Sequence, residues 1–122
     1  MVPLEGRDAV RVQGENATDL PDPEVEAVPA VTVLHPNVPN PFNPATTIRF
    51  DLARDGVVRL QIFDAAGRLV KTLVDGEMTR GFGKVVTWNG YDESGRHAPS
   101  GVYFYKLVTV DATATKKMVM LK

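Results

Sequence analysis

Three prolines within six residues, at positions 39, 41 and 44, constrain this chain more than any other feature. Each proline lacks an amide donor and has a fixed φ, so this stretch cannot form a helix or lie inside a sheet. Phe42 is the only large apolar side chain in the stretch, and we expect it to insert into the domain that follows. The run Pro39-Asn40-Pro41-Phe42-Asn43-Pro44 therefore predicts a stiff turn that leads into a β-domain.

Length and charge divide the chain into two parts. The chain has 122 residues, enough for one domain. Residues 1–30 hold seven acidic side chains and two arginines, whereas the remainder holds twelve basic and eight acidic side chains. Acidic, proline-containing segments with few aromatic residues stay solvated, so we predict an extended acidic leader over 1–32 and a folded domain over 33–122. Val10 and Val12 alternate with polar residues, which leaves a short strand in the leader as an alternative.

Composition excludes several classes of function. The chain has no cysteine, which excludes disulfides, thiolate catalysis and zinc sites with sulfur ligands. No apolar stretch approaches the roughly 20 residues of a membrane span, and no secretory signal pattern is found near Met1. The domain is mildly basic but lacks a long Arg/Lys run, so we expect no nucleic-acid partner.

From residue 31 onwards, apolar side chains alternate with polar ones, as in strands that are buried on one face. We predict strands over 31–34, 46–52, 57–63, 68–74, 84–88, 101–110 and 115–121. No segment shows sustained helical spacing. Seven short strands separated by turn signals predict an all-β, antiparallel sandwich of the immunoglobulin or fibronectin-III type.

Turn residues separate these predicted strands. Asp55-Gly56 is typical of a hairpin, and Asp75-Gly76 is expected to end the strand over 68–74. A tight turn is predicted at residues 64–67, where Gly67 would adopt a positive φ. Asn89-Gly90 and Ser94-Gly95 indicate a longer loop.

The chain offers little for catalysis. His35 precedes a proline, His97 lies in a glycine-flanked loop, and the two serines, Ser94 and Ser100, stand beside glycines at turns. An enzyme needs reactive groups that converge, and these residues are explained by turn chemistry alone. We therefore predict no catalytic residues and no organic cofactor.

A calcium ion is the best ligand hypothesis for this sequence. Asn89, Asp92 and Glu93 crowd one loop and offer the oxygen donors that hard cations require. However, the loop has no Asp-x-Asp-x-Asp ladder, and polar residues also fill such loops in order to form turns. We therefore expect no resident metal and keep these three residues as the calcium candidates.

The aromatic side chains allow two interpretations. Trp88 and Tyr103 are expected in the core, because a tryptophan between the sheets and a tyrosine early in the penultimate strand recur in this architecture. The alternative is a platform of Trp88, Tyr103 and Tyr105 on which a sugar stacks. The stretch over 102–108 is apolar on both faces, so alternation does not decide which tyrosine points outward.

Lysines flank an apolar core in the last predicted strand. This strand contains Lys116, Lys117, Met118, Val119, Met120, Leu121 and Lys122. Lysines on an outer strand guard against edge-to-edge pairing. The same residues suit a docking strand that a partner protein recognises through backbone pairing and basic contacts.

Several motifs, taken together, resemble a known family. Val38-Pro39-Asn40-Pro41-Phe42-Asn43-Pro44-Ala45-Thr46-Thr47-Ile48 resembles the opening of the C-terminal sorting domain of type IX secretion substrates, which overlaps with the immunoglobulin-like domain of the flagellar hook-capping protein family. The resemblance continues through Ile62-Phe63-Asp64, Gly67-Arg68, Val70, Leu73, Trp88-Asn89-Gly90, Ser94-Gly95, Ser100-Gly101-Val102-Tyr103-Phe104-Tyr105 and 116–122, and so covers residues 34–122. Asn89 replaces the aspartate that usually follows the tryptophan, and we expect this change to affect turn geometry only.

The resemblance implies a seven-stranded sandwich without catalytic activity. Such a domain lies at the C-terminus of exported proteins and is recognised by an outer-membrane translocon and by surface-attachment machinery. We therefore expect a C-terminal module that directs export through the periplasm and attachment to the cell surface. Two alternatives remain: a structural subunit that self-associates by strand addition, and an adhesive or carbohydrate-binding module.

Overall fold

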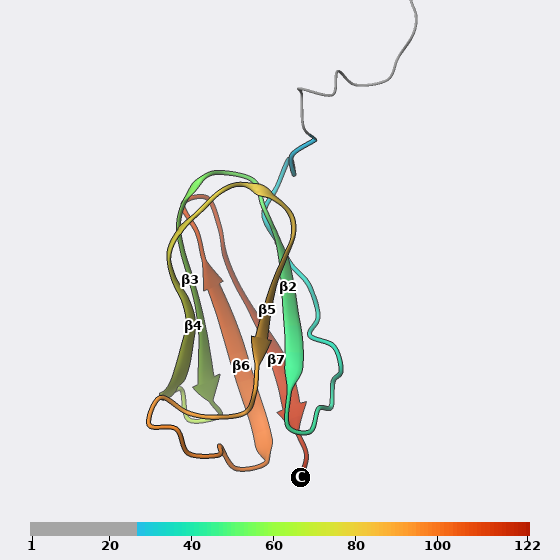
Figure 1. Cartoon of the computed structure of the whole chain (residues 1–122), viewed down its shortest axis with the longest axis vertical. Coiled ribbons are helices and arrows are strands. Elements are labelled where there is room, and N and C mark those ends of the chain that lie inside the picture. Colours follow the sequence, from blue (N-terminus) through green and yellow to red (C-terminus); the bar gives the residue numbers. More distant parts are fainter. Residues whose placement is uncertain (1–26) are drawn as a thin grey trace, which may run out of the picture.

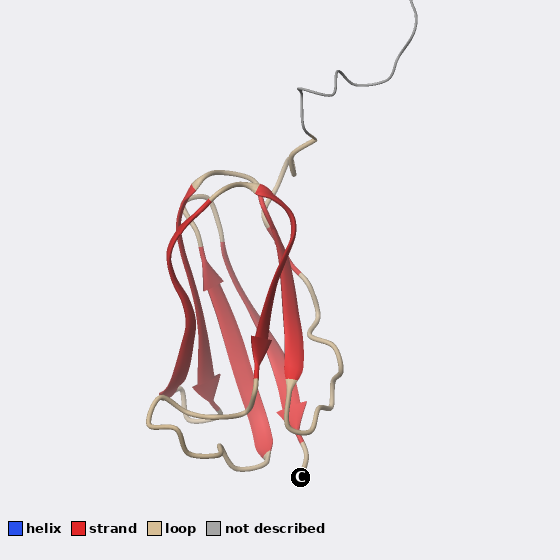
Figure 2. Ribbon diagram, in the orientation of Figure 1, coloured by secondary structure: helices blue, strands red, loops and turns tan. Residues whose placement is uncertain are grey.

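The computed structural model describes residues 27–122, which form seven antiparallel strands in two sheets (Figure 1, Figure 2). The strands are β1 (Val33–Leu34), β2 (Thr46–Leu52), β3 (Gly56–Asp64), β4 (Leu69–Met78), β5 (Gly81–Trp88), β6 (Gly101–Val108) and β7 (Thr113–Met120). The described part contains no helix. This confirms the predicted all-β sandwich. The first 26 residues of the expected leader, including the possible strand around Val10 and Val12, lie outside the described residues.

The two sheets have the orders β1-β2-β5 and β4-β3-β6-β7. β1 lies near β7, and β4 lies near β5, at the two opposite sides of the sandwich. Each sheet therefore ends in two outer strands, and the free edges of these strands border the two open sides. The candidate sites lie along these edges.

Alternation places the expected side chains in the core. The inward residues of β2 and β3 are fully buried: Ile48, Phe50, Leu52, Val58, Leu60 and Ile62. Burying one such side chain contributes roughly 1.5–3 kcal/mol. These six residues form the centre of the interface between the sheets, so the hydrophobic faces predicted from the sequence hold the two layers together.

Two turn predictions are wrong. Asp55-Gly56 connects β2 to β3, which lie in different sheets, so it forms a crossover between layers and not a hairpin. Asp75-Gly76 lies inside β4, where Gly76 pairs with Val58 and the strand continues to Met78. In both places long-range pairing decides the structure, and it overrides the local turn preference.

Other strand boundaries also differ from the prediction, and the first strand begins at Val33 and not at residue 31. β5 begins at Gly81 because the pairing with β2 extends to Leu52 beyond a register shift. β6 ends at Val108 because the Thr109 amide donates to the Ala112 carbonyl (2.8 Å) and closes a turn. β7 consequently begins at Thr113, two residues before the predicted start.

Thr32 connects the segment before β1 to the rest of the domain by hydrogen bonds. Its hydroxyl donates to the Asp111 carboxylate (3.0 Å) and accepts from the Ala53 amide (3.0 Å). These contacts reach the β6–β7 turn and the β2–β3 connection. Tertiary contacts of the domain therefore begin just before β1.

Candidate functional site

β7 is an outer strand of the four-stranded sheet, and β6 is its neighbour there. Met118 and Met120 point inward and are fully buried. Lys117 and Val119 lie on the outer face of the sheet, as alternation requires. The two methionines are therefore core residues, and a partner could not contact them without unfolding the strand.

The proline segment, residues 39–44, closes the C-terminal half of the free edge of β7. The Phe42 amide donates to the Val119 carbonyl (3.0 Å), and the Leu121 amide donates to the Phe42 carbonyl (2.9 Å). The Val119 amide donates to the side-chain oxygen of Asn40 (3.0 Å). The outward backbone groups of Val119 and Leu121 are therefore occupied and unavailable to another strand.

Two buried polar side chains hold the proline segment in place. The Asn37 amide group donates to the Pro39 carbonyl (3.2 Å) and to the Thr46 hydroxyl (3.0 Å). The Thr46 hydroxyl donates to the same Pro39 carbonyl (2.8 Å). Each hydrogen bond of this kind contributes about 0.5–1.5 kcal/mol net. The sequence analysis missed the role of Asn37.

Phe42 inserts into the core, where it is only 2% exposed. Its ring lies 5.7 Å from the Trp88 ring, and Trp88 in turn packs edge-on against Tyr103 at 5.2 Å. Tilted aromatic pairs of this kind contribute about 0.5–1.5 kcal/mol beyond their burial. The insertion expected from the sequence therefore fixes the proline segment to the body of the domain.

The alternative of a sugar platform is wrong for Trp88, Tyr103 and Tyr105, because all three are buried. Their polar atoms bond to backbone carbonyls: the Trp88 indole nitrogen donates to Tyr91 (2.9 Å), and the Tyr105 hydroxyl donates to His35 (2.8 Å). Burial raises the pKa of the Tyr105 hydroxyl. No face of these rings is available for stacking.

The N-terminal half of β7 remains open. Hydrogen bonds alternate along a strand, so the backbone groups of Thr113, Thr115 and Lys117 face the same edge as those of Val119. Within residues 27–122, no backbone group bonds to them on that side. Lys116 lies on the inward face beside Tyr105, and Lys117 lies on the outer face beside Phe104. Lysines therefore flank this open half-edge on both faces.

The predicted recognition residues thus fall into four groups. Lys116 and Lys117 flank the open half-edge; Met118 and Met120 are buried; and Val119 is held by the proline segment. Leu121 is half exposed, and Lys122 lies beside Asn43, Pro44 and His97 at a shallow groove. The lysines and Leu121 are accessible to a partner.

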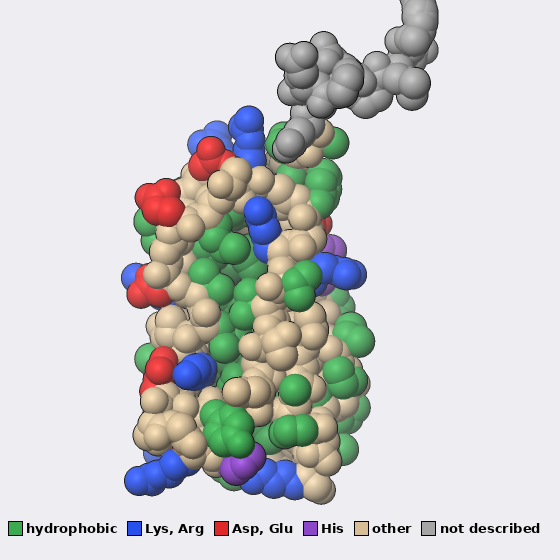
Figure 3. All heavy atoms as spheres, viewed as in Figure 1, with side chains coloured by type: hydrophobic (Ala, Val, Ile, Leu, Met, Phe, Trp, Pro, Cys, Tyr) green, Lys and Arg blue, Asp and Glu red, His purple; other side chains and the backbone are tan. Residues whose placement is uncertain are grey.

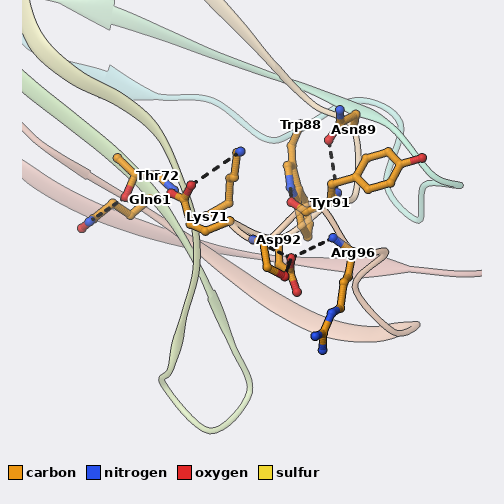
Figure 4. A network of polar contacts seen from close by, with 10 residues as sticks. Gln61, Lys71, Thr72, Trp88, Asn89, Tyr91, Asp92 and Arg96 are labelled. Carbon is orange, nitrogen blue, oxygen red and sulfur yellow. Dashed lines mark hydrogen bonds and ion pairs between the residues drawn. The ribbon is translucent and has the colours of Figure 1, made fainter.

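The three calcium candidates make separate contacts, and Figure 4 shows those of Asn89 and Asp92. Asn89 accepts from the Tyr91 amide (3.1 Å), Asp92 accepts from the Arg96 amide (3.0 Å), and Glu93 accepts from the Thr72 amide (2.8 Å). In the described part of the chain, no three His, Asp or Glu side chains cluster as metal ligands would. Each oxygen therefore has a structural contact of its own.

Glu93 covers part of the outer strand β4. Its amide donates to the Val70 carbonyl (3.0 Å), and its carboxylate accepts from the Thr72 amide (2.8 Å). The same carboxylate lies 3.7 Å from the Lys71 ammonium. The β5–β6 loop therefore caps this edge, as the proline segment caps β7.

Two turns at this end of the domain share one pattern. Residues 64–68 and 92–96 both have the sequence Asp-x-x-Gly-Arg. In each turn the Asp amide donates to the Arg carbonyl (2.9 and 2.8 Å), and the Gly amide donates to the Asp carbonyl (2.9 and 3.0 Å). Gly67 and Gly95 have φ values of 86° and 84°, a region that favours glycine. The sequence analysis missed this repeat, although the pattern itself was the available signal.

The aspartates of these turns carry lowered pKa values. The Arg68 amide, and then the Ala66 amide, hold the pKa of Asp64 below its usual value. The Ser94 hydroxyl, followed by the Arg96 amide, lowers the pKa of Asp92. Each carboxylate is stabilised in its charged form by donors from its own turn. The charge therefore serves the turn and is no sign of a catalytic acid.

The histidines lie in separate structural contacts. The His97 ring packs on Tyr91, with centroids 4.2 Å apart. The His35 Nε2 atom lies 2.9 Å from the Asp51 carboxylate, which also accepts from the Gly83 amide (2.9 Å). Asp51 thereby links the segment after β1 to β5.

A family model and several solved structures match this chain. The model described as the FlgD Ig-like domain matches residues 42–115. This match confirms the resemblance to the flagellar hook-capping family. No curated protein matches the sequence closely enough to be counted as a relative.

Three solved structures share the fold. Dimeric latent PorU from Porphyromonas gingivalis superposes with a TM-score of 0.60 at 24% identity, over 78% of this chain and 10% of that chain. PorZ from the same organism, a surface component of the type IX secretion system, gives 0.51 at 21% identity over 73% and 11%. FlgD from Xanthomonas campestris, a hook-capping protein, gives 0.50 at 22% identity over 75% and 63%. The chain thus spans about a tenth of the length of PorU and PorZ.

No helix in residues 27–122 has the length and apolar character needed to cross a bilayer.

Proposed function

Because the chain belongs to the FlgD Ig-like domain family, we propose that it is a non-catalytic module that directs export and cell-surface attachment of a larger secreted protein. Its partners would be proteins of a secretion translocon or of surface-attachment machinery. The fold shared with PorU and PorZ supports this proposal, since PorZ is described as an essential surface component of a type IX secretion system. The module would pass through the periplasm and act at the cell surface.

The open half-edge of β7 is the observation that carries the proposal. Thr113, Thr115 and Lys117 offer unpaired backbone groups in the described domain, and Lys116 and Lys117 flank them. A partner strand could pair with this backbone while its acidic side chains contact the lysines. The proline segment would restrict pairing to this half, because it occupies the other half.

Recognition would require the folded domain and not the terminal sequence alone. Phe42 bonds to Val119 and Leu121 and packs on Trp88, so the end of β7 is positioned by the core. Deleting residues 116–122 would remove Met118 and Met120 from the core and would unfold the module. A point change at the exposed Lys117 separates recognition from folding more cleanly.

The test is export of a reporter protein fused ahead of the full chain in a bacterium with a type IX secretion system. The variant Lys117→Glu should fold but leave the reporter in the periplasm. Arg59→Glu is the matched control, because it makes the same charge change on an exposed side chain of β3. Surface display of the lysine variant at the control level would refute the proposal.

A second candidate is a structural subunit that assembles by strand donation, and the uncovered edges of the sandwich favour it. Light scattering of the full chain over a range of concentrations separates the two functions. A mass that stays at one chain fits the export module. A mass that grows with concentration fits the assembly.

A further inference from the structure

β5 has a free edge of its own, on the side of the sandwich opposite to β7. The Thr47 amide and carbonyl bond to Val38, and the Arg49 carbonyl bonds to the His35 amide, so these groups of β2 face away from β5. Because the direction of the backbone hydrogen-bonding groups alternates along a strand, the residues of β5 that bond to β2 are Lys84, Val86 and Trp88. The backbone groups of Val85 and Thr87 therefore point outward. Within the described domain, no other backbone group bonds to them.

The open side between β4 and β5 is apolar. Figure 3 looks onto this side and shows hydrophobic side chains in a hollow between the two strands. Val70, Val74 and Met78 of β4 and Val86 of β5 pack against the core there and are only partly buried. Such a partly exposed apolar strip beside unpaired backbone suits the addition of a strand.

β5 has fewer protective features than β7 and β4, namely one lysine, Lys84, and one register shift against β2. β7 has the proline segment and its lysines, and β4 has Glu93 and two register irregularities. β5 contains no proline, and it exposes Phe82 and Val85 by 60% and 58%. An outer strand with exposed apolar side chains and unpaired backbone is a site where another chain can pair.

Basic and acidic side chains both border this edge, and Lys84 is the basic one on the inward face of β5 itself. Lys84 pairs with buried Phe50, so its side chain lies on the inward face and reaches over Gly81. Arg49 lies beside Val85 on the outer face, and Arg80 precedes the strand. On the facing strand β4, Asp75 is exposed and lies 3.7 Å from Arg59, and Glu77 is also exposed. An incoming carboxylate next to Lys84 would therefore meet favourable charge.

From this arrangement we infer that β5 accepts an extended segment of another protein, with apolar side chains toward the hollow and a carboxylate opposite Lys84. Val85 and Thr87 form the backbone pairs, and the apolar side chains cover Val86 and Val74. This surface is separate from the open half-edge of β7.

The test uses the full chain, labelled with ¹⁵N, and two synthetic peptides as probes. One peptide alternates valine and threonine over ten residues with one central valine replaced by glutamate, so that the glutamate shares the valine face and can lie opposite Lys84, and the other has lysine at that position. The glutamate peptide should shift and protect the amides of Val85 and Thr87, and it should bind about tenfold more tightly than the lysine peptide at low salt. Lys84→Glu should reverse this preference, whereas the control Arg59→Glu should leave it unchanged.

A second variant tests the backbone contact. Val85→Pro removes an outward amide that β2 does not use, and prolines are tolerated on outer strands. It should abolish binding of the glutamate peptide while the circular dichroism spectrum and melting temperature show a folded domain. If Val85→Pro unfolds the chain, Lys84→Glu alone decides the outcome.

Four results would overturn the inference. Equal binding of the two peptides would show that charge plays no role. Amide shifts confined to Thr113, Thr115 and Lys117 would assign the binding to β7. Protection of Val85 and Thr87 in the free monomer shows that the chain's own N-terminal segment occupies β5. Protection that grows with concentration assigns the edge to a second copy. Failure of the export assay bears on β7 only and leaves this inference standing.

Discussion

β7 and β5 are both outer strands, yet their free edges differ. The C-terminal half of the β7 edge is closed by Asn40 and Phe42, and lysines flank the remaining half. In the described domain, the edge of β5 is bare and bordered by apolar side chains (Figure 3). The groups that close β7 lie almost eighty residues away in the sequence. Whether an edge is available to a partner is therefore decided by distant segments and not by the strand itself.

The largest expected effect comes from truncating Phe42, whose ring anchors the proline segment that closes part of the β7 edge. Phe42→Ala would leave a cavity beside Trp88 and free the backbone of Val119, so we expect the free energy of unfolding to fall by about 3–5 kcal/mol. Phe82→Ala is the matched change on β5, and its ring is mostly exposed. We expect the Phe82 variant to stay within about 0.5 kcal/mol of the original chain. Urea denaturation measures both, and equal losses would contradict the contrast between the two edges.

A smaller loss of stability is expected at Asn40, whose side chain closes part of the β7 edge. Asn40→Ala removes the oxygen that accepts from the Val119 amide, so we expect a loss of about 0.5–1.5 kcal/mol. The Val119 amide should also exchange with solvent faster than in the original chain. Asn43→Ala serves as the control, because Asn43 belongs to the same segment. If both variants leave the exchange rate of the Val119 amide unchanged, the Asn40 side chain does not close the β7 edge.

Acid should weaken the contact that joins β5 to the segment after β1. The Gly83 amide, opposed by burial and aided by His35, lowers the pKa of the Asp51 carboxyl below its usual value of about 3.9. The stability that this carboxylate contributes is therefore present above that value and is lost as the pH falls through the lowered pKa. Asp51→Asn should make unfolding less dependent on pH in this acidic range. Thermal melts from pH 5 to pH 2 test this, and parallel curves for the two chains would count against it.

The sequence predicted the positions and buried faces of the strands better than it predicted which strands pair with each other. Alternation in 46–52 and 57–63 identified the buried faces, because burial on one side of a strand imposes a period of two. The connection at Asp55-Gly56 was assigned to a hairpin, since the same dipeptide can join strands within a sheet or between sheets. That choice depends on long-range pairing, which local residues do not encode.

The same limit applies to the candidate sites. The insertion of Phe42 followed from its position among prolines, and the lysines of β7 were visible as a pattern. The bonds from Phe42 to Val119 and Leu121, and from Glu93 to β4, arise only when distant segments meet in the fold. The burial of Tyr105 was equally hidden, because its stretch is apolar on both faces. Only the repeated Asp-x-x-Gly-Arg pattern could have been found beforehand.

Amide hydrogen exchange along β7 in the full chain is the most direct test of the half-closed edge. The account predicts slow exchange for Val119 and Leu121, whose amides donate to Asn40 and Phe42. It predicts fast exchange for Thr115 and Lys117, whose amides face the open half. Equally slow exchange at all four positions would mean that the half-edge is covered and cannot receive a partner strand.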